Sequence, residues 1–267
     1  MHLMLGDKCK ADFAELVCSY SHTELASPRR STVPLLAFWA KAESRFGELA
    51  AYLGLDPSDP VEFCFEFPVP VQQGRGKASF TDLMIKSSSF AVSIEAKYTE
   101  PAYETVNEWV ARPGKANREA VLGGWLCLIE KATGVRLGAA QVAEHPYQLI
   151  HRTASACYPP VKRRWVIYQL FPEPVPRRYL EHLSGLQRML SSQDGLSFGV
   201  LLSPLKKSPE YSKIEARWER GERDLSTEVR AGLLSGTLLG FGDLQFVMVD
   251  QNLATRVIHE GRRDDRI

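Results

Sequence analysis

Two short alternating segments joined by three serines constrain the fold of this chain more than any other feature. Residues 80–86 and 90–97 mix aromatic, apolar and polar side chains, and residues 87–89 form a Ser-Ser-Ser run suited to a turn. Two strands separated by a short polar turn predict a β-hairpin. A further alternating segment, residues 61–69, precedes the hairpin. Its phenylalanines are expected on one face of a strand, and these are Phe63, Phe65 and Phe67.

The two faces of the second hairpin strand differ in chemistry, because successive side chains on a strand point to opposite sides. One face carries Val92, Ile94 and Ala96, and the other carries Ser93, Glu95 and Lys97. Asp82 on the first strand can add a second acid to the polar face. Two carboxylates and one ammonium are costly to hold together unless a metal ion or an anionic substrate offsets their charge. The plain alternative is a solvent-facing strand on which Glu95 and Lys97 only keep the sheet soluble.

The order of these residues resembles the signature of the PD-(D/E)XK nucleases, a superfamily of restriction-endonuclease-like phosphodiesterases. Asp82 takes the place of the first acid, and Glu95-Ala96-Lys97 matches the Glu-x-Lys on the following strand. Thr81 stands where the namesake proline would be, and that proline carries no chemistry. The resemblance covers roughly residues 31–170, about half of the chain, and its setting on a hairpin with flanking helices strengthens it.

This resemblance implies a metal-dependent hydrolysis of phosphodiesters. Asp82 and Glu95 would be the metal ligands, joined by the backbone carbonyl of Ala96, and Lys97 would orient or deprotonate the attacking water. The implied cofactor is Mg²⁺, for which Mn²⁺ can substitute, because Mg²⁺ takes only one or two carboxylates and keeps several waters. Such a cation polarises the phosphate and lowers the pKa of a bound water.

A helix before the hairpin offers a third acid. Its apolar positions recur at helical spacing, and they are Leu35, Trp39, Ala42, Phe46, Leu49 and Leu53. Many members of the superfamily carry a glutamate on this helix. At about 100° per residue from Leu35, Glu43 falls at about 80°, on the flank of the apolar stripe, and Glu48 falls at about 220°, toward water. We therefore expect Glu43 to be a metal ligand, with a surface glutamate as the alternative.

A later helix carries a polar pair four residues apart. Within residues 145–157, Gln148 and Arg152 lie on one side, and Leu149 and Ile150 lie on the opposite side. The glutamine resembles a motif that follows the Glu-x-Lys strand in several branches of the superfamily, where the amide helps to position the water or the phosphate. The resemblance implies a catalytic role for Gln148, and Arg152 is a natural bidentate contact for a substrate phosphate. Ordinary polarity of a helix surface explains the pair equally well.

Bulk properties bound the compartment and the partners. No apolar run among the 267 residues reaches the roughly 18 that a membrane span needs. The first residues lack the pattern of a signal peptide, and the five cysteines show no paired spacing, so we expect a cytoplasmic protein without a membrane partner. The net charge of +1 does not by itself indicate a nucleic-acid-binding protein.

The succession of predicted elements indicates an α/β protein with a mixed central sheet flanked by helices. We expect an N-terminal segment at residues 1–30, a restriction-endonuclease-like core at residues 31–170 and a C-terminal α/β extension packed on the core at residues 171–267. The predicted function is a Mg²⁺-dependent nuclease, DNA favoured over RNA, in bacterial restriction, repair or defence against foreign DNA. The C-terminal region is available for a homodimer or a partner protein. One alternative is a catalytically inactive binding or assembly module on the nuclease fold, which the near-neutral charge favours. Another is an α/β protein of unrelated function.

Overall fold

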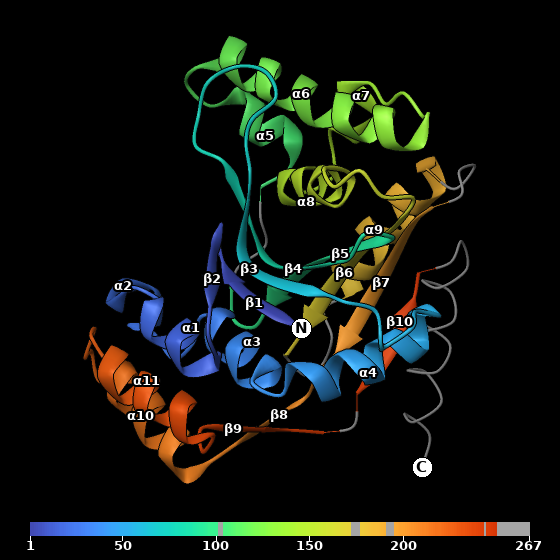
Figure 1. The fold of residues 1–267 in the computed structure, drawn as a ribbon. Coiled ribbons are helices and arrows are strands. Elements are labelled where there is room, and N and C mark those ends of the chain that lie inside the picture. Colours follow the sequence, from blue (N-terminus) through green and yellow to red (C-terminus); the bar gives the residue numbers. More distant parts are fainter. Residues whose placement is uncertain (101–103, 172–176, 191–194, 243, 250–267) are drawn as a thin grey trace, which may run out of the picture.

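A mixed eight-stranded sheet runs through the part of the chain that the computed structural model describes, which is residues 1–100, 104–171, 177–190, 195–242 and 244–249 (Figure 1). Its strands are β1 (His2–Leu5), β2 (Lys8–Lys10), β3 (Glu62–Val69), β4 (Ser79–Lys86), β5 (Phe90–Lys97), β6 (Arg163–Leu170), β7 (Leu196–Leu202) and β10 (Gln245–Met248). In space they follow the order β10-β7-β6-β5-β4-β3-β1-β2. A separate ribbon pairs β8 (Leu205–Lys207) with β9 (Leu239–Phe241).

The predicted hairpin forms the centre of this sheet. β4 and β5 pair antiparallel in a register that places Leu83 beside Ile94. β5, β6 and β7 run parallel to one another, and β3 runs antiparallel to β4 and parallel to β1. The edge strands β2 and β10 run antiparallel to their neighbours. The predicted fold class, a mixed central sheet flanked by helices, is therefore confirmed. The division of the chain into three segments stays a prediction, and strands from all three share this sheet.

Helices cover both faces of the sheet (Figure 1). One face carries α5 (Val106–Ala111), α6 (Lys115–Thr133), α7 (Ala139–Val142), α8 (Tyr147–Cys157) and α9 (Arg177–Leu190). The opposite face carries α1 (Phe13–Ser19), α2 (His22–Leu25), α3 (Thr32–Trp39), α4 (Ala42–Leu53), α10 (Pro209–Glu219) and α11 (Ser226–Ser235). Among the described residues, no helix combines the length and the apolar character that a membrane span requires.

Alternation along β5 divides its side chains between the two layers. Phe90 and Ile94 belong to the core that β5 shares with α3 and α4. Phe46 of α4 packs against this side of the sheet, with its ring centroid 6.1 Å from that of Phe90 and 5.8 Å from that of Phe63. Since Glu95 is the neighbour of Ile94 on the strand, its side chain points away from α4 and toward α8.

The single helix predicted before the hairpin is wrong. α3 ends at Trp39 and α4 begins at Ala42, and Lys41 between them has φ −108° and ψ 53°, outside the helical region. The physical reason is burial. α3 is enclosed on nearly all sides, whereas α4 buries one stripe and leaves its outer face in water. A hydrogen bond of 2.9 Å from the Trp39 indole to the buried Gln169 anchors the end of α3.

β3 departs from simple alternation at Glu66, whose φ of +49° lies in the left-handed region. Phe63 and Phe65 pack in the core on the α4 side, but Phe67 packs on the opposite side, where its ring lies 6.4 Å from that of Tyr158. The expectation that all three phenylalanines share one face is therefore wrong for Phe67. A non-glycine residue in this conformation costs about 1 kcal/mol or more, and such residues gather at functional sites.

Candidate active site

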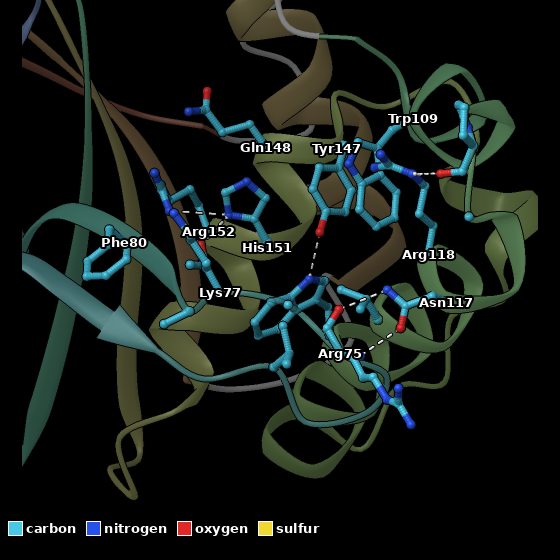
Figure 2. A pocket seen from close by; sticks show the side chains of 18 residues that line it. Arg75, Lys77, Phe80, Trp109, Asn117, Arg118, Tyr147, Gln148, His151 and Arg152 are labelled. Carbon is cyan, nitrogen blue, oxygen red and sulfur yellow. Dashed lines mark hydrogen bonds between the residues drawn. The ribbon is translucent and has the colours of Figure 1, made fainter.

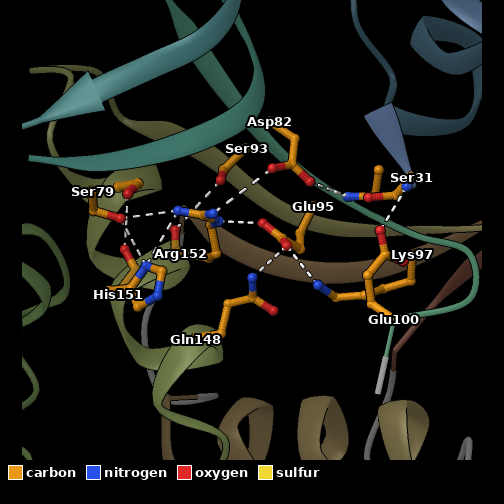
Figure 3. A network of polar contacts seen from close by, with 12 residues as sticks. Ser31, Ser79, Asp82, Ser93, Glu95, Lys97, Glu100, Gln148, His151 and Arg152 are labelled. Carbon is orange, nitrogen blue, oxygen red and sulfur yellow. Dashed lines mark hydrogen bonds and ion pairs between the residues drawn. The ribbon is translucent and has the colours of Figure 1, made fainter. Parts of the chain in front are cut away.

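Asp82 and Glu95 meet on the α8 side of the central hairpin (Figure 3). They lie on the adjacent antiparallel strands β4 and β5. The guanidinium of Arg152 lies between them: its Nη2 is 3.8 Å from Oδ1 of Asp82, and its Nε donates a hydrogen bond to Oε2 of Glu95. Nζ of Lys97 lies 2.7 Å from Oε1 of Glu95. The expected gathering of Asp82, Glu95 and Lys97 on one side of the sheet is confirmed.

Glu95 is a buried carboxylate with three donors. Its Oε1 accepts from Nζ of Lys97 and, at 2.5 Å, from Nε2 of Gln148, while its Oε2 accepts from Arg152. All four side chains are buried. Burial alone would raise the pKa of Glu95, but the charges of Arg152 and Lys97 and the hydrogen bonds they donate outweigh burial and lower it. Glu95 is therefore held ionised, as a buried charge requires partners.

The pKa of Asp82 is shifted in the opposite direction from that of Glu95. Its Oδ2 accepts a hydrogen bond of 2.8 Å from the backbone N–H of Ala96, and 22% of its side chain is exposed. Burial and the charge of Glu95 raise the pKa of Asp82 well above its usual range, and the charges of Arg152 and Lys97 offset only part of that rise. Two neighbouring acids with oppositely shifted pKa values are typical of functional sites.

The polar pair on α8 faces this cluster, as its spacing predicts. Gln148 and Arg152 both hydrogen-bond Glu95, and Nη1 of Arg152 also donates to Oγ of Ser79 at 2.9 Å. The guanidinium is thus engaged by Asp82, Glu95 and Ser79. In this arrangement Arg152 ties α8 to β4 and β5, and its predicted contact with a substrate phosphate stays a prediction.

The structure does not bring Glu43 to these residues. Glu43 lies exposed in the first turn of α4, and α4 packs on the opposite face of the sheet from Glu95. The break at Lys41 also changes the phase of α4 relative to α3, so an angle counted from Leu35 does not carry across it. Glu48 is exposed as well and pairs with Arg45 at 3.1 Å. The expectation of a third metal ligand on this helix is therefore corrected.

An acid that the sequence did not indicate lies beside the site. The register of β3 and β4 puts Glu66 opposite Asp82, so that acids follow one another across β3, β4 and β5. Burial first, and then the charge of Glu24, raises the pKa of Glu66 to about 7, with Arg152 acting in the other direction. Only the pairing of β3 with the hairpin could have revealed this neighbour, and the long loop between them hides that register from sequence patterns.

A Glu66→Gln variant should gain stability over wild type as the pH rises. The folded-state pKa of Glu66, about 7, is above that of an unfolded glutamate, so the folded protein retains a proton that the unfolded chain has lost. The proton that the folded state retains lowers the free energy of unfolding progressively as the pH rises above the unfolded pKa. This loss of stability levels off above pH 7. Urea unfolding should show the advantage of Glu66→Gln growing by about 2 kcal/mol from pH 5 to pH 8.

The exposed Glu43 provides the matched control for this comparison. Glu43→Gln should change the free energy of unfolding by less than about 0.5 kcal/mol at both pH values. An advantage of Glu66→Gln that is the same at pH 5 and pH 8 would show that charge burial at Glu66 is not the cause.

A divalent cation beside the two central acids would have few protein ligands. Asp82 is costly to ionise where it stands, and a cation beside it would reduce that cost. Among the described residues no group of three or more His, Cys, Asp or Glu is arranged to hold a metal ion. A cation here would therefore rely on Asp82, Glu95, water and substrate oxygens, which is the sparse set that Mg²⁺ accepts.

The fold and this cluster define a mixed α/β protein with paired carboxylates at the centre of its sheet. A family model described as Domain of unknown function (DUF6946) matches residues 11–197, and the chain belongs to this family. No curated protein and no solved structure matches the chain. The matched range includes every residue of the Asp82–Glu95 cluster.

Proposed function

We propose that this protein is a Mg²⁺-dependent nuclease of the PD-(D/E)XK type that acts on DNA in preference to RNA. The observation that carries the proposal is the convergence of two helix side chains, Gln148 and Arg152, on a hairpin glutamate more than fifty residues earlier in the chain. A Glu-x-Lys sequence that occurs by chance gives no reason for such convergence. A cytoplasmic location, a role in restriction, repair or defence against foreign DNA, and assembly through the C-terminal region belong to the same proposal.

The side chains divide the chemical work. A divalent cation bound at Asp82 and Glu95 would supply polarisation of the phosphate and a bound water of lowered pKa. The ammonium of Lys97 would orient the attacking water and balance charge on the phosphate, and that water, with its pKa lowered, would lose its proton to solvent. Nε2 of Gln148 donates a hydrogen bond to Glu95 and so fixes that carboxylate. Oε1 of Gln148 is buried without a hydrogen-bond partner among the described residues. That carbonyl oxygen is available to accept a hydrogen bond from a bound water.

A second candidate is a binding or assembly module that keeps the nuclease fold without catalysis. The observation that favours it is the self-sufficiency of the cluster: Glu95 already has Lys97, Gln148 and Arg152 as donors, and Arg152 also approaches Asp82. Arg152 thus supplies a positive charge between the acids without a metal. Titration of Mg²⁺ or Mn²⁺ separates the candidates, because only the nuclease should bind the cation at Asp82 and Glu95.

Wild-type protein should cleave DNA only when Mg²⁺ or Mn²⁺ is present, in assays that offer single- and double-stranded DNA and RNA. A Lys97→Met variant keeps the buried stem but loses the ammonium, so it should bind Mn²⁺ with little change while its cleavage rate falls by about 10² or more. Calorimetric titration and a gel assay measure the two quantities. Lys213→Met, at an exposed position on α10, is the control and should cleave as wild type does.

Wild-type protein that cleaves none of these nucleic acids under any metal condition contradicts the nuclease and leaves the binding module. A Lys97→Met variant with full activity would contradict the role given to Lys97 while leaving the metal-binding acids in place.

A further inference from the structure

A cavity of about 550 Å³ opens beside the carboxylate cluster (Figure 2). Gln148, His151 and Arg152 of α8 line it and also belong to the polar network around Glu95. The other walls come from the loop before β4, from α5 and from the first half of α6. Its volume lies within the roughly 300–1,000 Å³ typical of small-ligand sites. The proposed active site and this pocket therefore share one helix face.

The loop on one side of the pocket is fixed to α6. The backbone N–H of Arg75 donates to Oδ1 of Asn117 at 2.7 Å, and Nδ2 of Asn117 donates back to the carbonyl of Arg75 at 2.8 Å. Gly74 has φ +75°, and a Cβ there would lie 2.9 Å from Val121, so this close approach requires glycine. The backbone that presents Arg75 is thus preorganised.

Aromatic rings stand on two sides of the pocket. The rings of Trp109 and Tyr147 are stacked with centroids 3.7 Å apart, and the guanidinium of Arg118 lies 4.8 Å from the Trp109 ring centroid. Phe80 stands on the opposite side and is 45% exposed (Figure 2). An exposed phenylalanine ring at one end of the pocket and an aromatic stack at the other both offer contact area to a planar ligand.

The charged side chains that line the pocket are all positive. Arg75, Lys77, Arg118 and Arg152 contribute them, and none of the described residues lining the pocket is an aspartate or a glutamate. The net charge of the whole chain is only +1, so this uniform sign is a local arrangement and not a consequence of composition. The pocket is suited to an anion.

His151 adds a neutral donor to the pocket. Its Nδ1 lies 3.2 Å from Nη1 of Arg152 and 2.9 Å from Oγ of Ser79. An arginine can only donate, so Nδ1 accepts and the ring proton belongs on Nε2. Burial and the charges of Arg152 and Lys97 lower the pKa of His151 well below its usual range, which keeps the ring neutral. In the described part of the chain Nε2–H has no hydrogen-bond partner, and it can donate to a ligand oxygen.

We propose that this pocket binds one unpaired nucleotide of the substrate, with its base between Phe80 and the Trp109–Tyr147 stack and its phosphates at the cations of the rim. The inference rests on the proposed function and specifies the substrate of that site. Aromatic rings that stack on bases and a groove of uniformly positive charge are the two elements of single-strand recognition. A ligand that is both anionic and planar can contact the cations and the aromatic rings of the pocket at the same time.

The base contact in this proposal requires an unpaired nucleotide. A base within a continuous duplex is stacked on its neighbours and paired, so it reaches such a pocket only from a single-stranded region or after leaving the stack. The substrate class is therefore DNA with a single-stranded end, flap or gap next to the scissile phosphate.

Binding without cleavage tests this inference directly. Fluorescence anisotropy of a labelled single-stranded oligodeoxynucleotide in EDTA should show Phe80→Ala binding about tenfold more weakly than wild type, and Phe80→Trp binding at least as well as wild type. Lys77→Ala should weaken binding and reduce the salt slope by about 0.7. Lys213→Ala on α10, an exposed lysine outside the pocket, should bind as wild type does. A blunt duplex of the same sequence should bind more weakly and should not respond to Phe80→Ala.

The outcomes separate this inference from the nuclease proposal. If Phe80→Ala and Lys77→Ala both bind the single strand as tightly as wild type, the proposed nucleotide site in this pocket is wrong, even if the wild-type protein cleaves DNA in Mg²⁺. A blunt duplex that binds as tightly as the single strand overturns the unpaired nucleotide. Weakened binding in both variants with rescue by Phe80→Trp supports the pocket, even if no protein of the set cleaves DNA and the nuclease proposal fails.

Discussion

An Asp82→Asn variant is expected to lose metal-dependent cleavage by about 10² or more while remaining at least as stable as wild type. The amide oxygen can still accept the Ala96 N–H that Asp82 accepts at 2.8 Å, but the side chain has no charge with which to hold a cation. Burial and the charge of Glu95 raise the pKa of Asp82, so ionised Asp82 lowers the stability of the folded state at a pH above the unfolded pKa. Asparagine removes that cost, and its advantage should grow as the pH rises.

Cleavage of labelled DNA in Mg²⁺ and urea unfolding at two pH values measure these two effects. Asp59→Asn, in the turn that follows α4, is the matched control and should change neither. Cleavage at the wild-type rate by Asp82→Asn would remove Asp82 from the active site. A large loss of stability would instead show that its carboxylate is needed by the fold.

Glu95→Gln should destabilise the protein by about 3–5 kcal/mol as well as remove cleavage. Lys97 and Gln148 donate to one oxygen of Glu95 and Arg152 donates to the other, so whichever oxygen the amide nitrogen of a glutamine replaces, one of the two cations loses its acceptor. Two buried cations would also lose the carboxylate that compensates them. The physical cost is therefore the uncompensated charge that remains, and not only the hydrogen bonds that are lost.

Chemical denaturation measures this effect, with Glu62→Gln as the control. Glu62 pairs with Lys86 in the same sheet, but 44% of its side chain is exposed. Loss of that pair should cost less than about 1 kcal/mol. If Glu95→Gln is as stable as Glu62→Gln, the buried network does not hold α8 to the hairpin.

Comparison of the Asp82 and Glu95 variants separates effects on cleavage from effects on the stability of the fold. The proposed mechanism gives both acids the same metal, so both substitutions are expected to stop cleavage. Only Glu95 is also the centre of a buried ion network, so only its loss should also lower the free energy of unfolding substantially. Mutation of Glu95 alone would therefore be an ambiguous test of catalysis, and Asp82→Asn is the cleaner one.

The central hairpin and the face that carries its acids were determined by the sequence alone. Strand alternation has a period of two residues and needs no long-range information, so Glu95 and Lys97 had to lie on the side opposite Ile94. The same holds for α8, where a spacing of four residues puts Gln148 and Arg152 on one helix face. Both local patterns survive in the structure because burial of their apolar sides agrees with them.

Positions that depend on two distant segments were decided only by the tertiary structure. The chain breaks at Lys41 between α3 and α4, and Glu43 is away from the site because α4 packs on the face of the sheet opposite Glu95. The place of Glu66 opposite Asp82 depends on a strand register across a loop, which no local period specifies. The pocket likewise joins a loop, two helices and the face of α8, so its uniform charge could not be read from any one stretch of sequence. Local periodicity sets which way a side chain points, whereas burial between distant segments sets what it meets.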